Sequence, residues 1–140
     1  MENSLHPIPA FLRQHEVASV CATDDAGPFC FSCFYGFEPD AMLLIFKSAD
    51  TSRQGRTLTE DARVAGTVLG GLLTLADNDG LRFEGIVVSI TPDDRAAALY
   101  NAQYPIAGLV SGRLFAIALQ HVCLTQTFAW RRRKYEWHAG

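Results

Sequence analysis

The chain alternates short apolar segments with compact turn signals, a pattern typical of antiparallel β-sheets. Residues 17–23 and 29–37 are rich in β-branched or aromatic side chains, and Asp24–Pro28 between them predicts a tight turn. Within 29–37 every second residue is large and apolar or cysteine, which predicts one side that faces a core. A third strand is predicted over 41–48, after a turn at Glu38–Asp40. Short turns between successive strands favour antiparallel pairing.

The second half of the chain continues this pattern. Asp77–Gly80 predicts the turn of a hairpin, and Gly70-Gly71 permits a sharp bend before it. Further strands are predicted over 63–70, 72–76, 81–91 and 114–127, and 128–137 is a candidate for one more.

Three segments with different patterns interrupt the strands. Ile8–Glu16 carries its apolar residues on one helical face. Asp50–Asp61 is polar apart from Leu58 and predicts a short surface helix or helical loop. Thr91–Asp94 is typical of a helix start, and Pro105 ends that helix. Six or seven strands with two or three short helices, over 140 residues without repeat or linker, indicate one mainly-β domain spanning 1–140.

Composition and charge exclude several classes of protein. Apolar residues make up 49% of the chain and charged residues 19%, which argues against disorder. The formal net charge of −3 gives no general attraction to nucleic acid or to anionic lipid, so neither is predicted as a partner. No apolar run approaches the roughly 20 residues that span a membrane. Met1–Pro7 lacks the basic start and apolar core of a signal peptide, which predicts a cytoplasmic protein.

The cysteines are predicted to be buried thiols rather than ligands or crosslinks. Cys30 and Cys33 have CxxC spacing, but residues three apart on a strand point to opposite faces and cannot share a metal ion or a disulfide. The four cysteines are Cys21, Cys30, Cys33 and Cys123.

No catalytic or metal-binding residue is predicted. A Ser–His–Asp arrangement or a metal site would require the histidines to converge over long distances, and the sequence shows no sign of this. The four histidines are His6, His15, His121 and His138.

A basic run, Arg131–Lys134, lies between aromatic residues near the end of the chain. Such a run can bind single-stranded nucleic acid. Alternation along a strand would divide its charges between two faces, so a solvated edge is favoured instead. Trp130, just before the run, is a candidate to line a cofactor or dimer cleft.

The most informative stretch for chemistry is Lys47–Leu58, which gathers cations, hydroxyls and an amide where a strand gives way to a helix start. Backbone N–H groups at a helix start attract phosphate, and an arginine fork holds its oxygens two at a time. Gly55 is unfavourable in a helix, so a reason other than helix propensity is expected for it. The alternative interpretation is a solvated amphipathic turn with surface arginines.

Three segments in order, Leu43–Ser48, Ser52–Leu58 and Asp61–Ala65, resemble the pyridoxamine 5′-phosphate oxidase-like split-barrel family. That family commonly shows a strand, a polar turn, a basic helix and a return into the sheet. Arg82–Gly85 resembles the family's strand with its recurring glycine. The resemblance covers 17–127, rests on the order and spacing of several motifs, and is closest to a small, poorly characterised bacterial subgroup.

The resemblance implies a six- to seven-stranded antiparallel split β-barrel that forms a homodimer and holds FMN in a cleft between subunits. The flavin would perform the redox step, as in an FMN-dependent oxidoreductase of unknown substrate. Alternatives are a split-barrel dimer that binds haem or a deazaflavin, or one that binds no cofactor and acts as a binding or sensor module. Gln54 stands where cofactor-binding relatives usually carry lysine. The resemblance places the phosphate at Lys47, Ser48, Ser52, Arg53 and Gln54, and the ring against the strand with Ser32 and Phe34.

Overall fold

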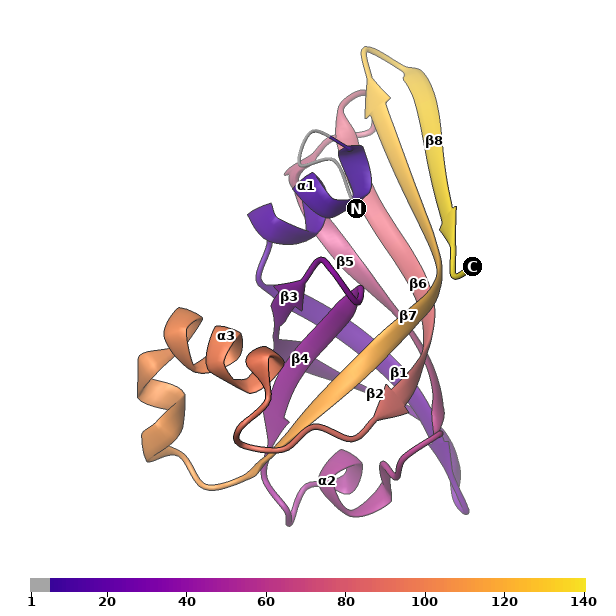
Figure 1. Cartoon of the computed structure of the whole chain (residues 1–140). Coiled ribbons are helices and arrows are strands. Elements are labelled where there is room, and N and C mark those ends of the chain that lie inside the picture. The colour runs from indigo at the N-terminus through magenta and orange to yellow at the C-terminus, as the bar shows by residue number, and fades with distance from the viewer. Residues whose placement is uncertain (1–5) are drawn as a thin grey trace.

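The chain forms one curled antiparallel sheet with helices at its margins (Figure 1). The computed structural model describes residues 6–140, apart from the side chain of residue 72. The predicted absence of a signal peptide rests on residues 1–7, most of which lie outside the described residues. The elements are α1 (Pro7–Gln14), β1 (Val17–Asp24), β2 (Gly27–Phe34), β3 (Gly36–Glu38), β4 (Leu43–Ser48), α2 (Arg53–Thr57), β5 (Arg63–Leu73), β6 (Asn78–Val88), α3 (Arg95–Gln103), the 3-10 helix η1 (Pro105–Leu109), β7 (Arg113–Phe128) and β8 (Arg131–His138).

The sheet curls into a barrel that is not closed by hydrogen bonds. Its strand order is β2-β1-β5-β6-β7-β4-β3, with β8 added to β7, so β2 and β4 are not ladder neighbours. They meet through side chains instead: the rings of Phe31 and Phe46 lie 5.6 Å apart between centroids. We call the line along which β2 faces β4 the seam. An antiparallel barrel open along one seam confirms the predicted mainly-β split-barrel class.

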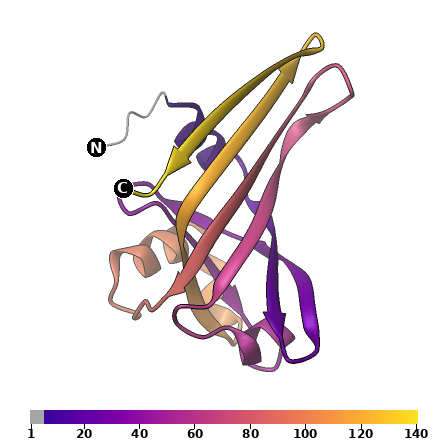
Figure 2. The same cartoon turned by 90° about the vertical axis from the view of Figure 1, so that its right-hand side faces the viewer.

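Strand β7 connects the two halves of the sheet. Residues 113–118 pair with β4, whereas residues 121–128 pair with β8. The register between β6 and β7 shifts at Glu84/Gly85, which leaves Gln120 as an extra residue on β7. Such a bulge bends a strand and increases its twist. The β7–β8 hairpin therefore leaves the barrel as a long arm (Figure 2).

Two apolar cores hold these elements in place. The larger core fills the inside of the barrel, where the buried positions of β1 alternate as Ala18, Val20 and Ala22, and α1 covers one end. The smaller core lies on the outer side of β4, where Ile45 packs with Ala96, Tyr100 and Ala116 beneath α3. Strand β4 is thus covered on both faces. Within the described residues, no helix is long and apolar enough to cross a membrane.

The predicted strand over 29–37 is divided at Tyr35 into β2 and β3, which is one reason the sheet has eight strands rather than six or seven. The Tyr35 N–H donates to Glu16 O at 2.8 Å, and its carbonyl accepts from the Tyr104 hydroxyl at 2.6 Å. The first bond continues the β1–β2 register by one residue, whereas the second binds the Tyr35 carbonyl to a side chain. From Gly36 on, the chain pairs with β4 instead.

Three other features differ from the sequence prediction. Gly70-Gly71 makes no sharp bend, because β5 continues through it to Leu73 with only an irregular register. The hairpin turn lies at 74–77, where Thr74 and Asp77 bond to each other, rather than at 77–80. Helix α3 begins at Arg95 instead of at Pro92, because Asp94 takes the N-cap position.

Tyr35 also fastens α1 to the barrel, because its buried hydroxyl donates to Leu12 O at 2.8 Å. We expect Tyr35→Phe, which leaves this carbonyl without its donor, to lower the free energy of unfolding by about 1–3 kcal/mol in urea denaturation. Tyr135→Phe, which removes the same atom from a half-buried side chain of β8, should cost about 0.5 kcal/mol or less. Equal losses in the two variants would contradict this role of Tyr35.

Candidate functional site

The polar segment after β4 is organised by its own hydrogen bonds. Ser48 is buried at the end of β4 and accepts from Gln54 Nε2 at 3.1 Å. Ser52 caps α2: its Oγ accepts from the Gly55 N–H at 3.0 Å and donates to Ala49 O at 2.7 Å. A Cβ on Gly55 would lie 2.0 Å from that same carbonyl oxygen, which explains why glycine stands there. The structure therefore brings together three of the residues predicted to hold phosphate: Ser48, Ser52 and Gln54.

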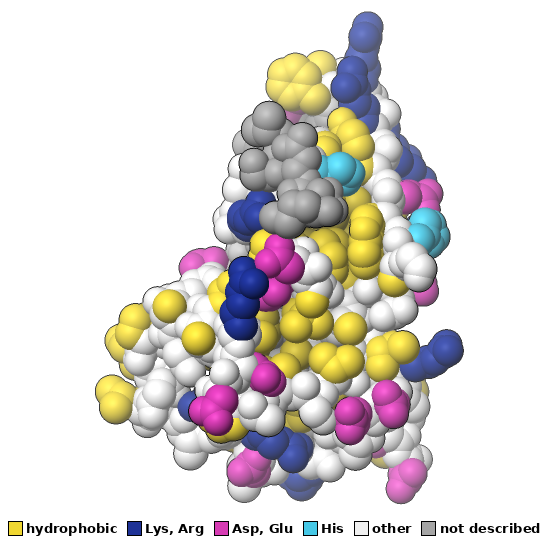
Figure 3. All heavy atoms as spheres, viewed as in Figure 1, with side chains coloured by type: hydrophobic (Ala, Val, Ile, Leu, Met, Phe, Trp, Pro, Cys, Tyr) yellow, Lys and Arg dark blue, Asp and Glu magenta, His cyan; other side chains and the backbone are white. Residues whose placement is uncertain are grey.

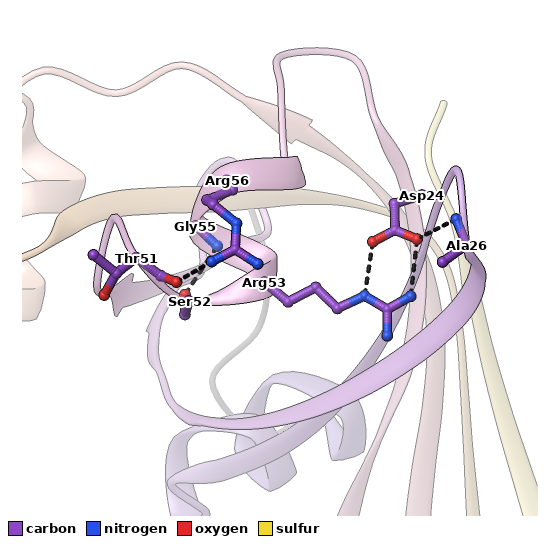
Figure 4. Close-up of polar contacts among 7 residues, drawn as sticks. All are labelled: Asp24, Ala26, Thr51, Ser52, Arg53, Gly55 and Arg56. Atoms are coloured by element: carbon purple, nitrogen blue, oxygen red, sulfur yellow. Dashed lines mark hydrogen bonds and ion pairs between the residues drawn. The ribbon is translucent and has the colours of Figure 1, made fainter.

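Arg53 extends from α2 to the turn between β1 and β2 (Figure 4). Its Nε and Nη2 donate to the two carboxylate oxygens of Asp24 at 2.7 and 2.8 Å, and its guanidinium lies 4.2 Å from the centre of the Phe29 ring. The hydrogen bond from Arg53 is the main reason that the pKa of Asp24 is lowered to about 2, and the Ala26 N–H contributes. Nη1 lies on the side of the guanidinium away from the carboxylate. Arg53 thus ties α2 to Asp24 of β1 and to Phe29 of β2 at one end of the seam.

Aromatic side chains mark the other end of the seam. Phe34, which is 58% exposed, meets the edge of the Tyr104 ring at 6.1 Å between centroids. Burial is the largest of the causes that raise the pKa of Tyr104 to about 12, so its hydroxyl keeps its proton at neutral pH. Ser32 lies two residues before Phe34 on the same exposed side of β2. The two residues predicted to face a cofactor ring are thus accessible.

Lys47 points away from this cluster. Its side chain lies on the side of β4 opposite to Phe46, and its Nζ donates to Ala107 O of η1 at 2.7 Å. Lys47 therefore braces η1 in this structure, and its predicted contact with phosphate would require it to leave that carbonyl.

Trp130 lies at the tip of the β7–β8 arm, whereas α2 lies at the opposite end of the molecule (Figure 1). It is 72% exposed and, like Ala129, adopts a positive φ, as expected for a two-residue hairpin turn. Its backbone N–H donates to Ala76 O at 3.0 Å, which joins this tip to the β5–β6 turn. Arg131–Lys134 follow it and are all exposed, and basic side chains gather at the tip in Figure 3. Within one chain, Trp130 does not join the residues around α2.

Two hollows accompany these elements. One of about 460 Å³ lies beside α2 and is lined by Arg56, Arg113 and Phe115 among others. Arg113 stacks on Phe115 and donates to Gly55 O at 3.1 Å. Sequence reasoning missed this arginine, because it lies 58 residues after Gly55 and only the pairing of β4 with β7 brings it there. The other hollow, of about 490 Å³, lies on the outer face of β1, β5 and β6.

The prediction that all four cysteines are buried is wrong for Cys21 and Cys30, which are exposed. They face each other across β1 and β2 on the outer face of the sheet, with 2.8 Å between their sulfurs. Cys33 lies on the inner side, and its burial raises the pKa of its thiol to about 12. The predicted separation of Cys30 from Cys33 is therefore confirmed, and Cys123 is buried as expected.

Comparisons with known proteins give the fold a context. No family model matches the chain. A UPF0306 protein from Yersinia pseudotuberculosis is 29% identical over 132 residues, which cover 93% of this chain and 90% of the relative.

Solved structures share the fold at low sequence identity. A haem-binding protein from Mycobacterium smegmatis superposes with a TM-score of 0.72 at 16% identity, over 89% of this chain but only 54% of the other. A FAD-binding protein from Mesorhizobium loti superposes with a TM-score of 0.65 at 15% identity, over 88% of this chain and 96% of the other. The chain therefore has a split-barrel fold that it shares with proteins that bind haem or flavin.

Proposed function

We propose that the chain binds FMN at the seam and acts, as a homodimer, in a flavin-dependent redox reaction. The observation that carries this proposal is the position of α2, which sets Arg53, Ser52 and Gln54 at the end of an exposed strand. The existence of flavin-binding proteins with the same fold supports it.

The proposed phosphate site has one cation, Arg53, and one neutral side-chain donor, Gln54. Arg53 uses two nitrogens for Asp24 and retains Nη1 for a phosphate oxygen. The Gln54 amide gives one hydrogen to Ser48 and keeps a second for a phosphate, whereas the Ser52 hydroxyl gives its only hydrogen to Ala49 O. Charge-assisted contacts are about twice as strong as neutral ones. Because α2 has only five residues, side chains rather than a helix dipole have to supply most of the attraction. These groups fit a phosphate. Arg53 would make one strong contact, and Gln54 would make a weaker one where a lysine would have made the second strong contact.

The ring site is open in a single chain. Ser32 and Phe34 lie on the exposed side of β2 and provide one wall for a flat aromatic ring. A ring of that size is shielded from water only if a second surface covers its other face, since cofactor pockets bury most of their ligand. A second copy of the chain would supply that wall, and Trp130 would reach such a cleft only from the second copy.

The donor set favours FMN over haem. Haem needs an axial ligand, most often histidine. In the described part of the chain, the histidines lie next to α1 or on β7 and β8, not at the seam. Arg53 and Gln54 match a phosphate, which FMN carries and haem lacks. FMN would supply the electron-transfer chemistry itself, so the residues of the chain have to hold, orient and shield it.

Loss of the Arg53 side chain tests the phosphate contact. We expect Arg53→Ala to weaken FMN binding about 10- to 150-fold, which corresponds to about 1.5–3 kcal/mol for one charge-assisted contact. Arg56→Ala is the matched control, because Arg56 lies on the same helix and its guanidinium donates to the Thr51 carbonyl. Quenching of flavin fluorescence in a titration gives both affinities.

Failure of the reduced, purified chain to bind either FMN or haemin would overturn the proposed function, and a haemin Soret band without flavin binding would favour haem.

A gain in affinity is expected at Gln54. Gln54→Lys places a second cation beside the phosphate, and we expect FMN to bind about 10- to 100-fold more tightly. Gln54→Met has a similar length and no charge, and it should not improve binding. Equal affinities of the lysine and methionine variants would contradict a phosphate at this position.

The pairing of Arg53 with Asp24 can be tested without any ligand. Arg53→Gln should return the pKa of Asp24 most of the way from about 2 toward 3.8, because Arg53 is the largest cause of the lowering. A pKa lowered by folding stabilises the folded state above the unfolded pKa, and this contribution is lost as the pH falls toward the folded pKa. Carboxyl ¹³C shifts followed down to about pH 3 should show Asp24 titrating in the variant and still ionised in the wild type. An ionised Asp24 in both proteins at that pH would show that Arg53 does not hold it.

A further inference from the structure

Three metal-ligating side chains converge on the outer face of the β7–β8 arm. His121 of β7 and His138 of β8 are directly opposite in the register, and their rings stack with 4.2 Å between centroids. Glu136 lies two residues before His138, on the same face of β8. Its Oε2 is 3.0 Å from His121 Nε2 and 3.5 Å from His138 Nε2. Both imidazoles therefore direct the same nitrogen at one carboxylate.

The backbone fixes this arrangement. All three residues belong to paired strands, and the Ala139 N–H donates to Gln120 O at 2.9 Å, so the ladder continues past the cluster. The three ligand atoms lie within 4.8 Å of one another. Exposed ion pairs contribute only about 0–1 kcal/mol to stability, so stability alone gives little reason for two histidines to share one carboxylate.

We propose that His121, Glu136 and His138 form a binding site for a borderline divalent transition-metal ion such as Zn²⁺. Two neutral imidazoles and one carboxylate are a three-ligand set that zinc accepts, with a fourth position left for water or another ligand. The same nitrogen and oxygen donors bind Cu²⁺ more tightly than Zn²⁺. The carboxylate of a glutamate is ionised at neutral pH and can therefore bind a cation.

The surroundings leave the fourth position accessible. His138 and Glu136 are 66% and 53% exposed, whereas His121 is only 22% exposed and anchors the cluster to the sheet. His121 also lines a hollow of about 220 Å³ on the outer face, together with Arg82, Glu84 and Thr67. A metal-bound water or a small anionic ligand would therefore face a space that also carries an arginine.

Thiols are the competing ligands that an experiment has to separate. Cys123 is opposite Glu136 in the register but buried. Cys21, which forms an exposed pair with Cys30, lines the same hollow as His121. Thiolates bind zinc as readily as imidazoles do. Cobalt distinguishes the two cases, because Co²⁺ bound to thiolate gives intense near-ultraviolet absorption and Co²⁺ bound only to nitrogen and oxygen does not.

The test is a calorimetric titration of the reduced, full-length chain with Zn²⁺, paired with Co²⁺ absorption. We expect one Zn²⁺ per chain, and at least about tenfold weaker binding in His138→Ala and Glu136→Gln, since loss of an outer-shell partner alone costs that much. His15→Gln removes a histidine outside the cluster and should bind as the wild type does. Because both cluster side chains are exposed, these variants should keep the far-ultraviolet circular dichroism of the wild type.

Three results would overturn the proposal: no Zn²⁺ binding by the wild type, unchanged affinity in both cluster variants, or a thiolate–cobalt band that disappears in Cys21→Ser/Cys30→Ser. The site is independent of the FMN proposal, because the arm carries it and α2 does not contribute to it.

Discussion

The structure depends on a sheet that curls round until β2 lies beside β4 and yet does not join them by ladder hydrogen bonds. The packing of Phe31 on Phe46 joins β2 to β4 inside the barrel. At one end Arg53 of α2, the helix that follows β4, contacts Asp24 of β1 and Phe29 of β2. An open seam leaves one side of β2 accessible, and exposed edge strands are where proteins accept further partners. The accessible side of β2 is where the proposed flat ligand would lie, outside the apolar core.

Arg53 illustrates how structure and proposed function share one side chain. Its stacking on Phe29 and its two bonds to Asp24 fix the guanidinium before any ligand arrives. A donor that is already held in position loses little entropy on binding, which partly offsets the modest number of cations nearby. The neutral Gln54, bonded to Ser48, keeps the segment ordered but adds no charge. A site of this composition suits a cofactor that exchanges more readily than one held by several cations.

Local patterns in the sequence predicted much of the fold. Alternation along β1 and β2 indicated which residues face the core, and the motifs near Arg53 indicated the split barrel. What could not be predicted depends on long-range contacts. The break at Tyr35 involves the hydroxyl of Tyr104, and Arg113 reaches α2 only through the pairing of β4 with β7. The histidines likewise looked scattered, because their convergence follows from the register of β7 and β8.

The seam and the arm are two separate regions, the first with the proposed phosphate site and the second with the proposed metal site. The most direct measurement of the central claim is a crystal structure of the chain grown with FMN. We predict a phosphate oxygen within hydrogen-bonding distance of Arg53, the flavin ring on β2 beside Ser32 and Phe34, and a second copy of the chain covering the ring. Flavin bound away from α2, or a seam covered by the second copy with no room for a ring, would contradict it.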